Sequence, residues 1–267
     1  MPTAYTAMRV MTFNLRYDNP GDGDHAWPRR RDLAISLMRS AGPQLLGVQE
    51  ALAAQVEDLQ AAMPGYRWLG VGRGDGLRCG EFNAIFYEAS RFQCRENGTF
   101  WLSEDPARPG SRGWDAAYPR LVTWAALLDQ VTGARFYYFN THFDHIGAAA
   151  RRAGSRLLLE KIHHLAGGLP VVVTGDFNAR PGEEPIRLLT DPKDPRHLTD
   201  ARQLCEAPPE GPAGTFNGFG VPGPEPGPID YIFLRGNWQV SRHLTLAGPG
   251  DGRFASDHYP VMAVLSG

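Results

Sequence analysis

The chain has 267 residues, of which 42% are hydrophobic, 10% aromatic and 21% charged, and its formal net charge is −2. This composition is typical of a folded globular protein and excludes disorder along the whole chain. It argues against a strongly basic protein that binds nucleic acid by charge alone, and no apolar run approaches the roughly 20 residues of a membrane helix.

The elements expected from hydrophobic periodicity mix strands and helices. In chain order we expect a strand at 9–15, a helix at 30–40, a strand at 45–49, a helix at 51–62, strands at 66–70, 83–87, 122–129 and 135–140, a helix at 148–165, a strand at 170–174, a short helix at 183–189, and strands at 229–234 and 259–265. This order indicates an α/β layered protein. No internal repeat or interdomain linker is visible, so we expect residues 1–267 to form a single domain.

Two glycine-rich segments are expected to be loops. Residues 208–228 are crowded with Pro and Gly, and a loop of that length is either a lid or binding loop or is mobile. Residues 70–81 contain alternating glycines and charges, but they lack the strand, GxGxxG and helix context of a phosphate-binding loop.

The number and spacing of the cysteines indicate the kind of cellular compartment. Cys79, Cys94 and Cys205 are widely spaced and form no CxxC pair, which supports neither a disulfide framework nor a zinc site. The N-terminal segment also lacks the apolar region of a signal peptide. We expect a soluble, cytoplasmic protein without membrane insertion, and nothing in the sequence implies a protein partner.

The segment 171–178, VVVTGDFN, is the most informative part of the chain. An apolar strand ends in Asp176 and Asn178, and residues two apart in an extended chain face the same way, so both should project together while Phe177 enters the core. The structural alternative is a strand followed by an ordinary Asx turn.

Other short segments also place polar groups at the end of an apolar strand. They are MTFN, ending at Asn14; LLGVQE, ending at Glu50; FNTHFD, with His142 and Asp144; PIDYIF, with Asp230; and ASDHYP, with Asp257 and His258. Together they predict one polar cavity at strand ends. Oxygen ligands without thiolates suit a hard cation such as Mg²⁺ or Mn²⁺.

TFN, QE, NTHFD, GDFN, IDYIF and SDHYP occur in the order seen in the endonuclease/exonuclease/phosphatase superfamily, and the chain resembles that family from Thr12 to Pro260. The resemblance implies the DNase I-like fold, a four-layer sandwich of two packed mixed β-sheets flanked by helices. The abasic-site endonuclease branch has an acid two residues after the first-motif Asn, where this chain has Arg16. NTHFD is more similar to the branch of deadenylase-type exonucleases, sphingomyelinases and small-molecule phosphatases.

The resemblance also implies roles for the matching residues. Glu50 would be the main ligand of Mg²⁺ or Mn²⁺, with Asn14 and Asp257 in its inner or outer coordination sphere. Asp176 would orient or deprotonate the attacking water, and Asn178 would hold this water or a phosphate oxygen. His142 and His258 would donate hydrogen bonds to the phosphoryl oxygens, and Asp230 would orient His258.

Further assignments rest on our own interpretation of the residues. Arg120 could add a phosphate clamp, and Asp144 could orient His142 or His145. The basic clusters 29–31 and 151–156 are expected on solvated helix faces, and the tryptophans 27, 101 and 114 are expected in the core. For each site residue the alternative is a purely structural role, such as a turn cap for Asn14 or an arginine partner for Asp230.

The sequence therefore predicts a metal-dependent hydrolase that cleaves phosphoester bonds by in-line attack of water. A small phosphoester or a single-stranded nucleic acid is the expected substrate, because the charge is near neutral. The alternatives are a DNA or RNA endonuclease with the same mechanism and, more remotely, a binding protein that keeps the fold without catalysis. The retained polar set argues against the last alternative.

Overall fold

The computed structural model describes residues 7–221, 227–248 and 252–267. It contains two mixed sheets of six strands each. In spatial order, the first is β11 (Gln239–Thr245), β12 (Val261–Ser266), β1 (Met8–Asn14), β2 (Leu45–Gln49), β4 (Ile85–Glu88) and β3 (Tyr66–Leu69). The second is β5 (Phe92–Trp101), β6 (Leu121–Asp129), β7 (Arg135–His142), β8 (Val171–Asp176), β10 (Asp230–Arg235) and β9 (Thr199–Asp200).

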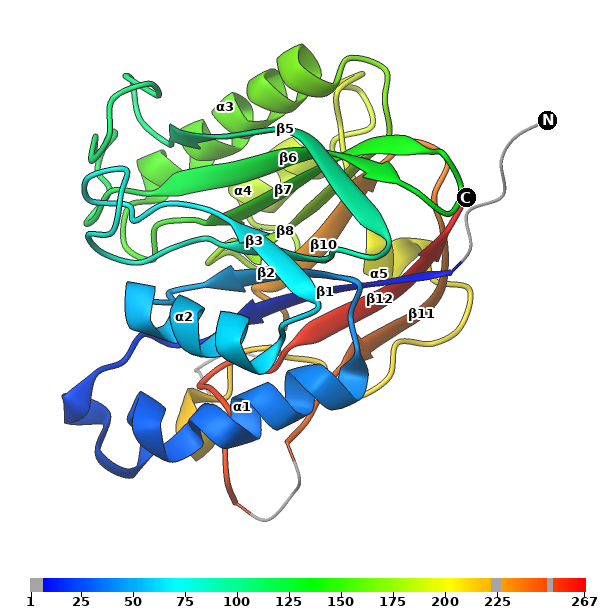
Figure 1. Cartoon of the computed structure of the whole chain (residues 1–267). Helices are drawn as coiled ribbons and strands as arrows, with labels where there is room; N and C mark the ends of the chain where they lie inside the picture. The colour runs from blue at the N-terminus through cyan, green and yellow to red at the C-terminus, as the bar shows by residue number, and fades with distance from the viewer. Residues whose placement is uncertain (1–6, 222–226, 249–251) are drawn as a thin grey trace.

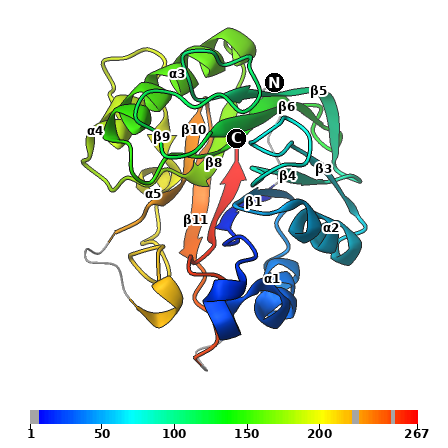
Figure 2. The ribbon, with the colours of Figure 1, turned by 90° about the vertical axis from the view of Figure 1, so that its left-hand side faces the viewer.

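Helices cover the outer face of each sheet, so the molecule has four layers (Figures 1 and 2). α1 (Trp27–Ala41) and α2 (Ala53–Ala62) pack on the first sheet, and α3 (Ala148–Ala166) and α4 (Glu184–Thr190) pack on the second. A further apolar core fills the space between the sheets. Shorter elements are α5 (Ala201–Leu204) and the 3₁₀ turns η1 (Pro20–His25) and η2 (Gly218–Gly220). The expected sandwich architecture is thus confirmed.

The helix α1 shows why these residues form these elements. Pro28 occupies its first turn, where a missing N–H costs nothing, and Gly42 ends it in the left-handed conformation with φ of 55°. Its buried residues fall at 27, 30, 34 and 38, which is the spacing of one helical face. Arg30 belongs to that face and is only 2% exposed, so the expectation of a solvated basic cluster is wrong for this residue.

A buried polar cluster joins the two sheets below the candidate site. Gln49 Nε2 donates to Asn140 Oδ1 at 2.7 Å, and Asn140 Nδ2 donates to the carbonyls of Val48 and Ala84. A Cβ on Gly47 would collide with the Asn140 side chain, so glycine permits this close approach of the sheets.

Other expectations can be compared with the structure directly. The expected helices and strands are present with small shifts at their ends, whereas β5, β9 and β11 were not expected. Trp27 and Trp101 are buried as expected, but Trp114 is 38% exposed. The cysteines are free, and none of the described helices combines the length and apolar character needed to cross a bilayer.

Candidate active site

In the first sheet, the polar strand ends lie at one edge because β1 and β2 run parallel. Asn14 pairs with Gln49 at the ends of these strands, and Glu50 follows directly. β12 pairs antiparallel with β1, so Asp257 and His258, which precede β12, arrive at the same edge.

The second sheet brings a matching set to this edge. β7 and β8 run parallel, and their last residues, His142 and Asp176, are direct neighbours. β10 runs antiparallel to β8 and begins at Asp230, which pairs with Asp176 on its other side. The topology therefore brings together the residues of the strand-end motifs.

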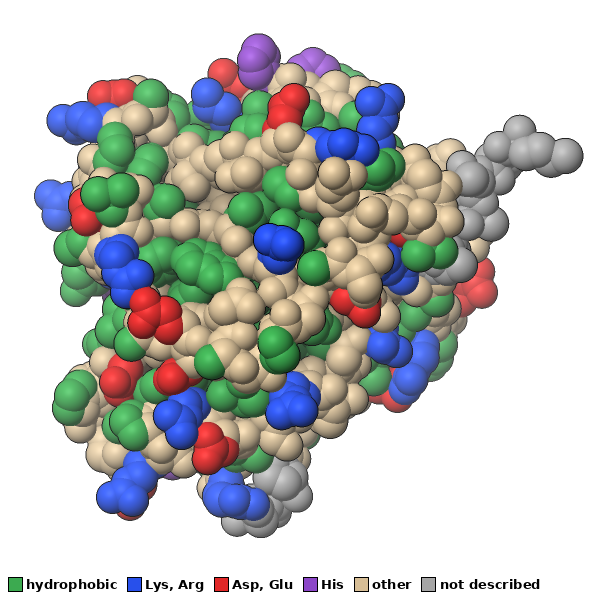
Figure 3. All heavy atoms as spheres, viewed as in Figure 1, with side chains coloured by type: hydrophobic (Ala, Val, Ile, Leu, Met, Phe, Trp, Pro, Cys, Tyr) green, Lys and Arg blue, Asp and Glu red, His purple; other side chains and the backbone are tan. Residues whose placement is uncertain are grey.

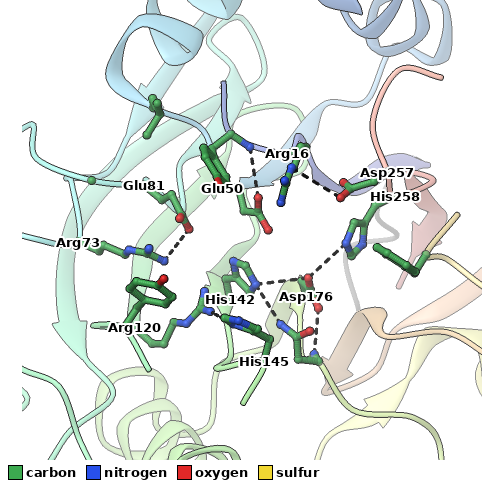
Figure 4. A pocket seen from close by; sticks show the side chains of 16 residues that line it. Arg16, Glu50, Arg73, Glu81, Arg120, His142, His145, Asp176, Asp257 and His258 are labelled. Carbon is green, nitrogen blue, oxygen red and sulfur yellow. Dashed lines mark hydrogen bonds and ion pairs between the residues drawn. The ribbon is translucent and has the colours of Figure 1, made fainter. Parts of the chain in front are cut away.

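These side chains face a pocket of about 570 Å³ (Figure 4). Its lining includes the predicted residues Glu50, Arg120, His142, Asp176, Asn178, Asp257 and His258. Asn14 and Asp230 lie behind this lining and contact it, and Asp144 is buried behind Arg120. Residues that the sequence did not identify as part of the site also line the pocket: Arg16, Tyr17, Leu52, Arg73, Gly80, Glu81, Tyr118, His145 and Phe216.

Asn14 joins two carboxylates. Its Nδ2 donates to Glu50 Oε1 at 3.0 Å and to Asp176 Oδ2 at 2.9 Å. Its amide oxygen accepts from the backbone N–H of Arg16 at 2.9 Å. This arrangement favours a role for Asn14 in holding the two acids, outside the inner coordination sphere of any ion.

His258 lies between two buried carboxylates. Its Nδ1 is 2.9 Å from Asp230 Oδ2, the predicted contact, and its Nε2 is 3.8 Å from Asp176 Oδ2. Burial lowers the pKa of His258, but the charge and hydrogen bond of Asp230 outweigh this effect and place it well above its usual value. Burial and repulsion from Asp230 raise the pKa of Asp176 to about 7.

His142 has the opposite electrostatic environment. Burial, followed by the charges of Arg120 and Arg73, lowers its pKa well below the usual value, so the ring is neutral. Asn178 Nδ2 donates to Phe143 O, which fixes the orientation of the amide, and lies 3.0 Å from His142 Nε2. His142 Nε2 also lies 3.4 Å from Asp176 Oδ2, whereas Nδ1 is buried and has no partner among the described residues.

The backbone conformation that directs Asn178 to the pocket differs from the expected one. β8 ends at Asp176, and Asn178 has a left-handed backbone with φ of 46°, so the extended geometry that we assumed does not continue to it. Its N–H donates to Asp176 Oδ1 at 2.9 Å, closing an Asx turn that directs both side chains to the pocket. Glu50 also has positive φ, at 62°, and such strain in non-glycine residues concentrates at functional sites.

Asp144 contacts Arg120 and neither histidine. Its Oδ1 accepts from Arg120 Nε at 3.3 Å, and its Oδ2 accepts from the N–H groups of Ile146 and Gly147. Our expectation that Asp144 orients His142 or His145 is thus wrong, because the nearby guanidinium and backbone donors occupy both oxygens. It is Arg120 Nη2 that lies 3.0 Å from His145 Nδ1.

Comparison with known proteins gives the family. The model of the endonuclease/exonuclease/phosphatase family matches residues 11–258. The chain belongs to this family. A family member from Bacteroides vulgatus is 36% identical with a TM-score of 0.92, covering 97% of this chain and 98% of that one. A mannosyl-6-phosphatase from Bacteroides thetaiotaomicron is 35% identical with a TM-score of 0.88, covering 97% and 99%. The catalytic domain of human Nocturnin, at 19% identity and a TM-score of 0.76 over 97% and 93% of the chains, shares the fold.

The carboxylates around Glu50 are suited to bind a divalent cation. Burial foremost, and then the charge of Glu50, raise the pKa values of Asp257 and of Glu81, the latter to about 7. Arg16 lies 3.9 Å from Asp257 but forms a bidentate pair with Asp22. A hard cation between Glu50 and Asp257 would relieve this repulsion, so these residues fit the group.

A second group of possible ligands is the trio Asp176, Asp230 and His258, whose ligand atoms lie within 4.8 Å of one another. His258 Nδ1 and Asp230 Oδ2 are joined by a hydrogen bond, whereas Asp230 Oδ1 is buried and has no hydrogen-bond partner among the described residues. A protonated imidazole supplies there the positive charge that a metal would bring.

Proposed function

We propose that the protein is a divalent-metal-dependent hydrolase that cleaves small phosphoesters by in-line attack of water. The observation that carries this proposal is the convergence of Glu50, Asp176, Asp257 and His258 on one pocket. When bound at Glu50 and Asp257, Mg²⁺ or Mn²⁺ would supply charge stabilisation to the phosphoryl group.

Residues of the chain carry out the proton transfer and help to stabilise the charge on the phosphoryl group. Asp176, with its pKa raised to about 7, accepts a proton from the attacking water as its oxygen bonds to phosphorus. The bond from phosphorus to the leaving oxygen breaks, and its electron pair stays on that oxygen. Protonated His258 donates to a phosphoryl oxygen while Asp230 holds the ring, and Arg120 supplies a second cationic donor.

A phosphate monoester of a small polar molecule is the first candidate substrate. The pocket volume of about 570 Å³ suits a small ligand, and the relative named mannosyl-6-phosphatase supports a sugar phosphate. On the face in Figure 3, basic and acidic side chains are interspersed and form no continuous basic surface. A single-stranded nucleic acid end is the second candidate, because the exposed ring of Phe216 beside His258 could stack on a base.

The test is a substrate panel with Mg²⁺ or Mn²⁺ and with EDTA. It comprises an aryl phosphomonoester, mannose 6-phosphate, a bis-aryl phosphodiester, a single-stranded oligonucleotide and a plasmid. We expect metal-dependent monoester hydrolysis that Glu50→Ala and His258→Ala both abolish. Plasmid nicking that falls steeply with salt would instead identify an endonuclease. Hydrolysis that neither substitution changes would refute the site.

A further inference from the structure

One wall of the pocket consists of loop residues that no strand-end motif supplies. Arg73 and Glu81 come from the loop after β3, Tyr118 from the loop before β6, and His145 from the loop after β7. Figure 4 shows Arg73, Glu81 and His145 on the side of the pocket away from Asp257 and His258. This wall is therefore placed to meet the part of a substrate that carries no reacting phosphate.

Arg73 and Glu81 form the polar centre of this wall. Arg73 Nη1 donates to Glu81 Oε2 at 2.6 Å, and each side chain is 14% exposed. Within the described ranges, no hydrogen bond engages Glu81 Oε1 or Arg73 Nη2. The pair thus presents one available acceptor beside one available donor.

The loop that carries the pair is held rigidly despite its glycines. The backbone N–H of Arg73 donates to the carbonyl of Glu81 at 3.0 Å, and Trp101 Nε1 donates to the carbonyl of Arg73 at 2.8 Å. Gly74 N–H donates to the carbonyl of Cys79 at 2.8 Å. Groups held in this way lose little entropy when a ligand binds, as expected of a built recognition site.

The charge of the wall selects among ligand classes. Arg73 is paired with Glu81, and Arg120 is paired with Asp144, so neither guanidinium is without a counter-charge. A second phosphate or carboxylate on the substrate would therefore find no uncompensated positive charge on these two guanidinium groups. Hydroxyl groups both donate and accept, which matches an adjacent carboxylate and guanidinium.

The aromatic residues do not offer an open stacking surface here. The Tyr118 ring stacks with His145 at a centroid distance of 6.0 Å and 15° between planes, and the Arg73 guanidinium lies 4.9 Å from its centre. A nucleobase would have to displace one of these contacts. A polyhydroxylated group can instead bind to the polar edge of the wall.

We propose that Arg73 and Glu81 form a leaving-group subsite that recognises hydroxyl groups of a phosphorylated polyhydroxy alcohol. This inference rests on the proposed phosphoesterase function and names the part of the substrate that the enzyme distinguishes. Each of the two residues is a specificity residue that hydrogen-bonds the leaving group.

The experiment compares mannose 6-phosphate with 4-nitrophenyl phosphate, whose leaving group carries no free hydroxyl. In Glu81→Gln and Arg73→Met, the ratio of kcat/KM for the sugar phosphate to that for the aryl phosphate should fall by about 10- to 100-fold. Arg73→Lys should keep part of the ratio, because it retains one donor. The matched control is Arg78→Met. Arg78 lies on the same loop as Arg73 and forms an exposed pair with Glu57 of α2, so its substitution should leave the ratio unchanged.

The outcomes separate this inference from the proposed function. Loss of both activities in equal measure would overturn the subsite, because the residues would then act at the reacting phosphate or in folding. A kcat/KM ratio that Glu81→Gln and Arg73→Met both leave unchanged would also overturn it. Absence of hydrolysis of either monoester would refute the proposed function itself.

Discussion

Arg30 donates from Nη1 to the backbone carbonyl of Ala255 at 3.0 Å, across 225 positions of the sequence. The same guanidinium donates to the carbonyls of Leu15 and Arg16, which follow β1. One buried side chain thus connects the segment after Asn14 with the segment before Asp257. The two segments that carry these acidic and amide groups are held in register by it.

Arg30→Met should therefore lower both stability and activity. The substitution keeps the apolar stem but leaves buried carbonyls without donors, at a cost of about 2–4 kcal/mol in the free energy of unfolding. Displacement of Asp257 should lower kcat by about 10- to 100-fold. Urea unfolding and kcat for an aryl phosphate measure the two effects.

The control for this prediction is the next residue on the same helix. Arg31 is exposed and pairs with Asp32 on the surface, so Arg31→Met should leave stability and kcat close to wild type. Recovery of Arg30→Ala activity by added guanidinium would support the positioning role. Wild-type kcat in Arg30→Met would contradict it.

Asp230→Asn tests the support of His258. An amide cannot stabilise the imidazolium as a carboxylate does, so the pKa of His258 should fall and its donor form should be depleted at neutral pH. We expect kcat to fall by about 100-fold or more. Asp129→Asn is the matched control, because Asp129 is equally buried and pairs with Arg91 at the far end of β6. Its kcat per folded molecule should be unchanged, and an equal loss in both variants would count against a catalytic role for Asp230.

How far the sequence predicts this site depends on where each residue lies. Glu50, His142 and Asp176 lie at the ends of apolar strands and His258 lies just before one, so a local pattern indicates them. Parallel pairing of β1 with β2 and of β7 with β8, and antiparallel pairing of β1 with β12, then bring them together. Arg73, Glu81 and Tyr118 come from loops whose path depends on tertiary contacts, such as the bond from Trp101 to the Arg73 carbonyl. No period in the sequence marks such residues.

Two other differences between the structure and the sequence-based expectations have specific physical causes. Arg30 lies at the helical spacing of Trp27, Ala34 and Met38, so the α1 pattern contained a signal for its burial that its charge obscured. β5 and β11 were not expected because they are edge strands with many exposed polar residues. Their pairing with β6 and β12 determines their conformation more than local preference does.

Binding of a divalent ion at Glu50 should stabilise the folded protein. At an Mg²⁺ or Mn²⁺ concentration about 100 times Kd, the free energy of unfolding should rise by about 2.7 kcal/mol relative to EDTA. Glu50→Gln should remove most of this increase and the activity with it. Glu57→Gln on the exposed face of α2 serves as the control, and it should retain the full ion-dependent shift in Tm. An unchanged shift in Glu50→Gln would place the ion elsewhere.

Asp176→Asn should make the metal-free protein more stable while abolishing activity. Burial and the charge of Asp230 raise the pKa of Asp176 above its unfolded value, so the folded state binds this proton more tightly than the unfolded state. The contribution of Asp176 to stability consequently declines as pH rises from about 4 to about 7, and the amide should raise the free energy of unfolding at pH 8 by about 1–3 kcal/mol.

Asp200, whose pKa burial raises to about 6, lies outside the pocket and provides the comparison. Asp200→Asn should also gain stability at pH 8 but keep kcat, because an Asn side chain can still accept from the Arg202 N–H. Urea unfolding in EDTA at pH 5 and pH 8 measures the free energy of unfolding of both variants. If Asp176→Asn were less stable than the wild type at pH 8, the carboxylate would stabilise the fold, and its burial would not be a cost in stability that serves catalysis.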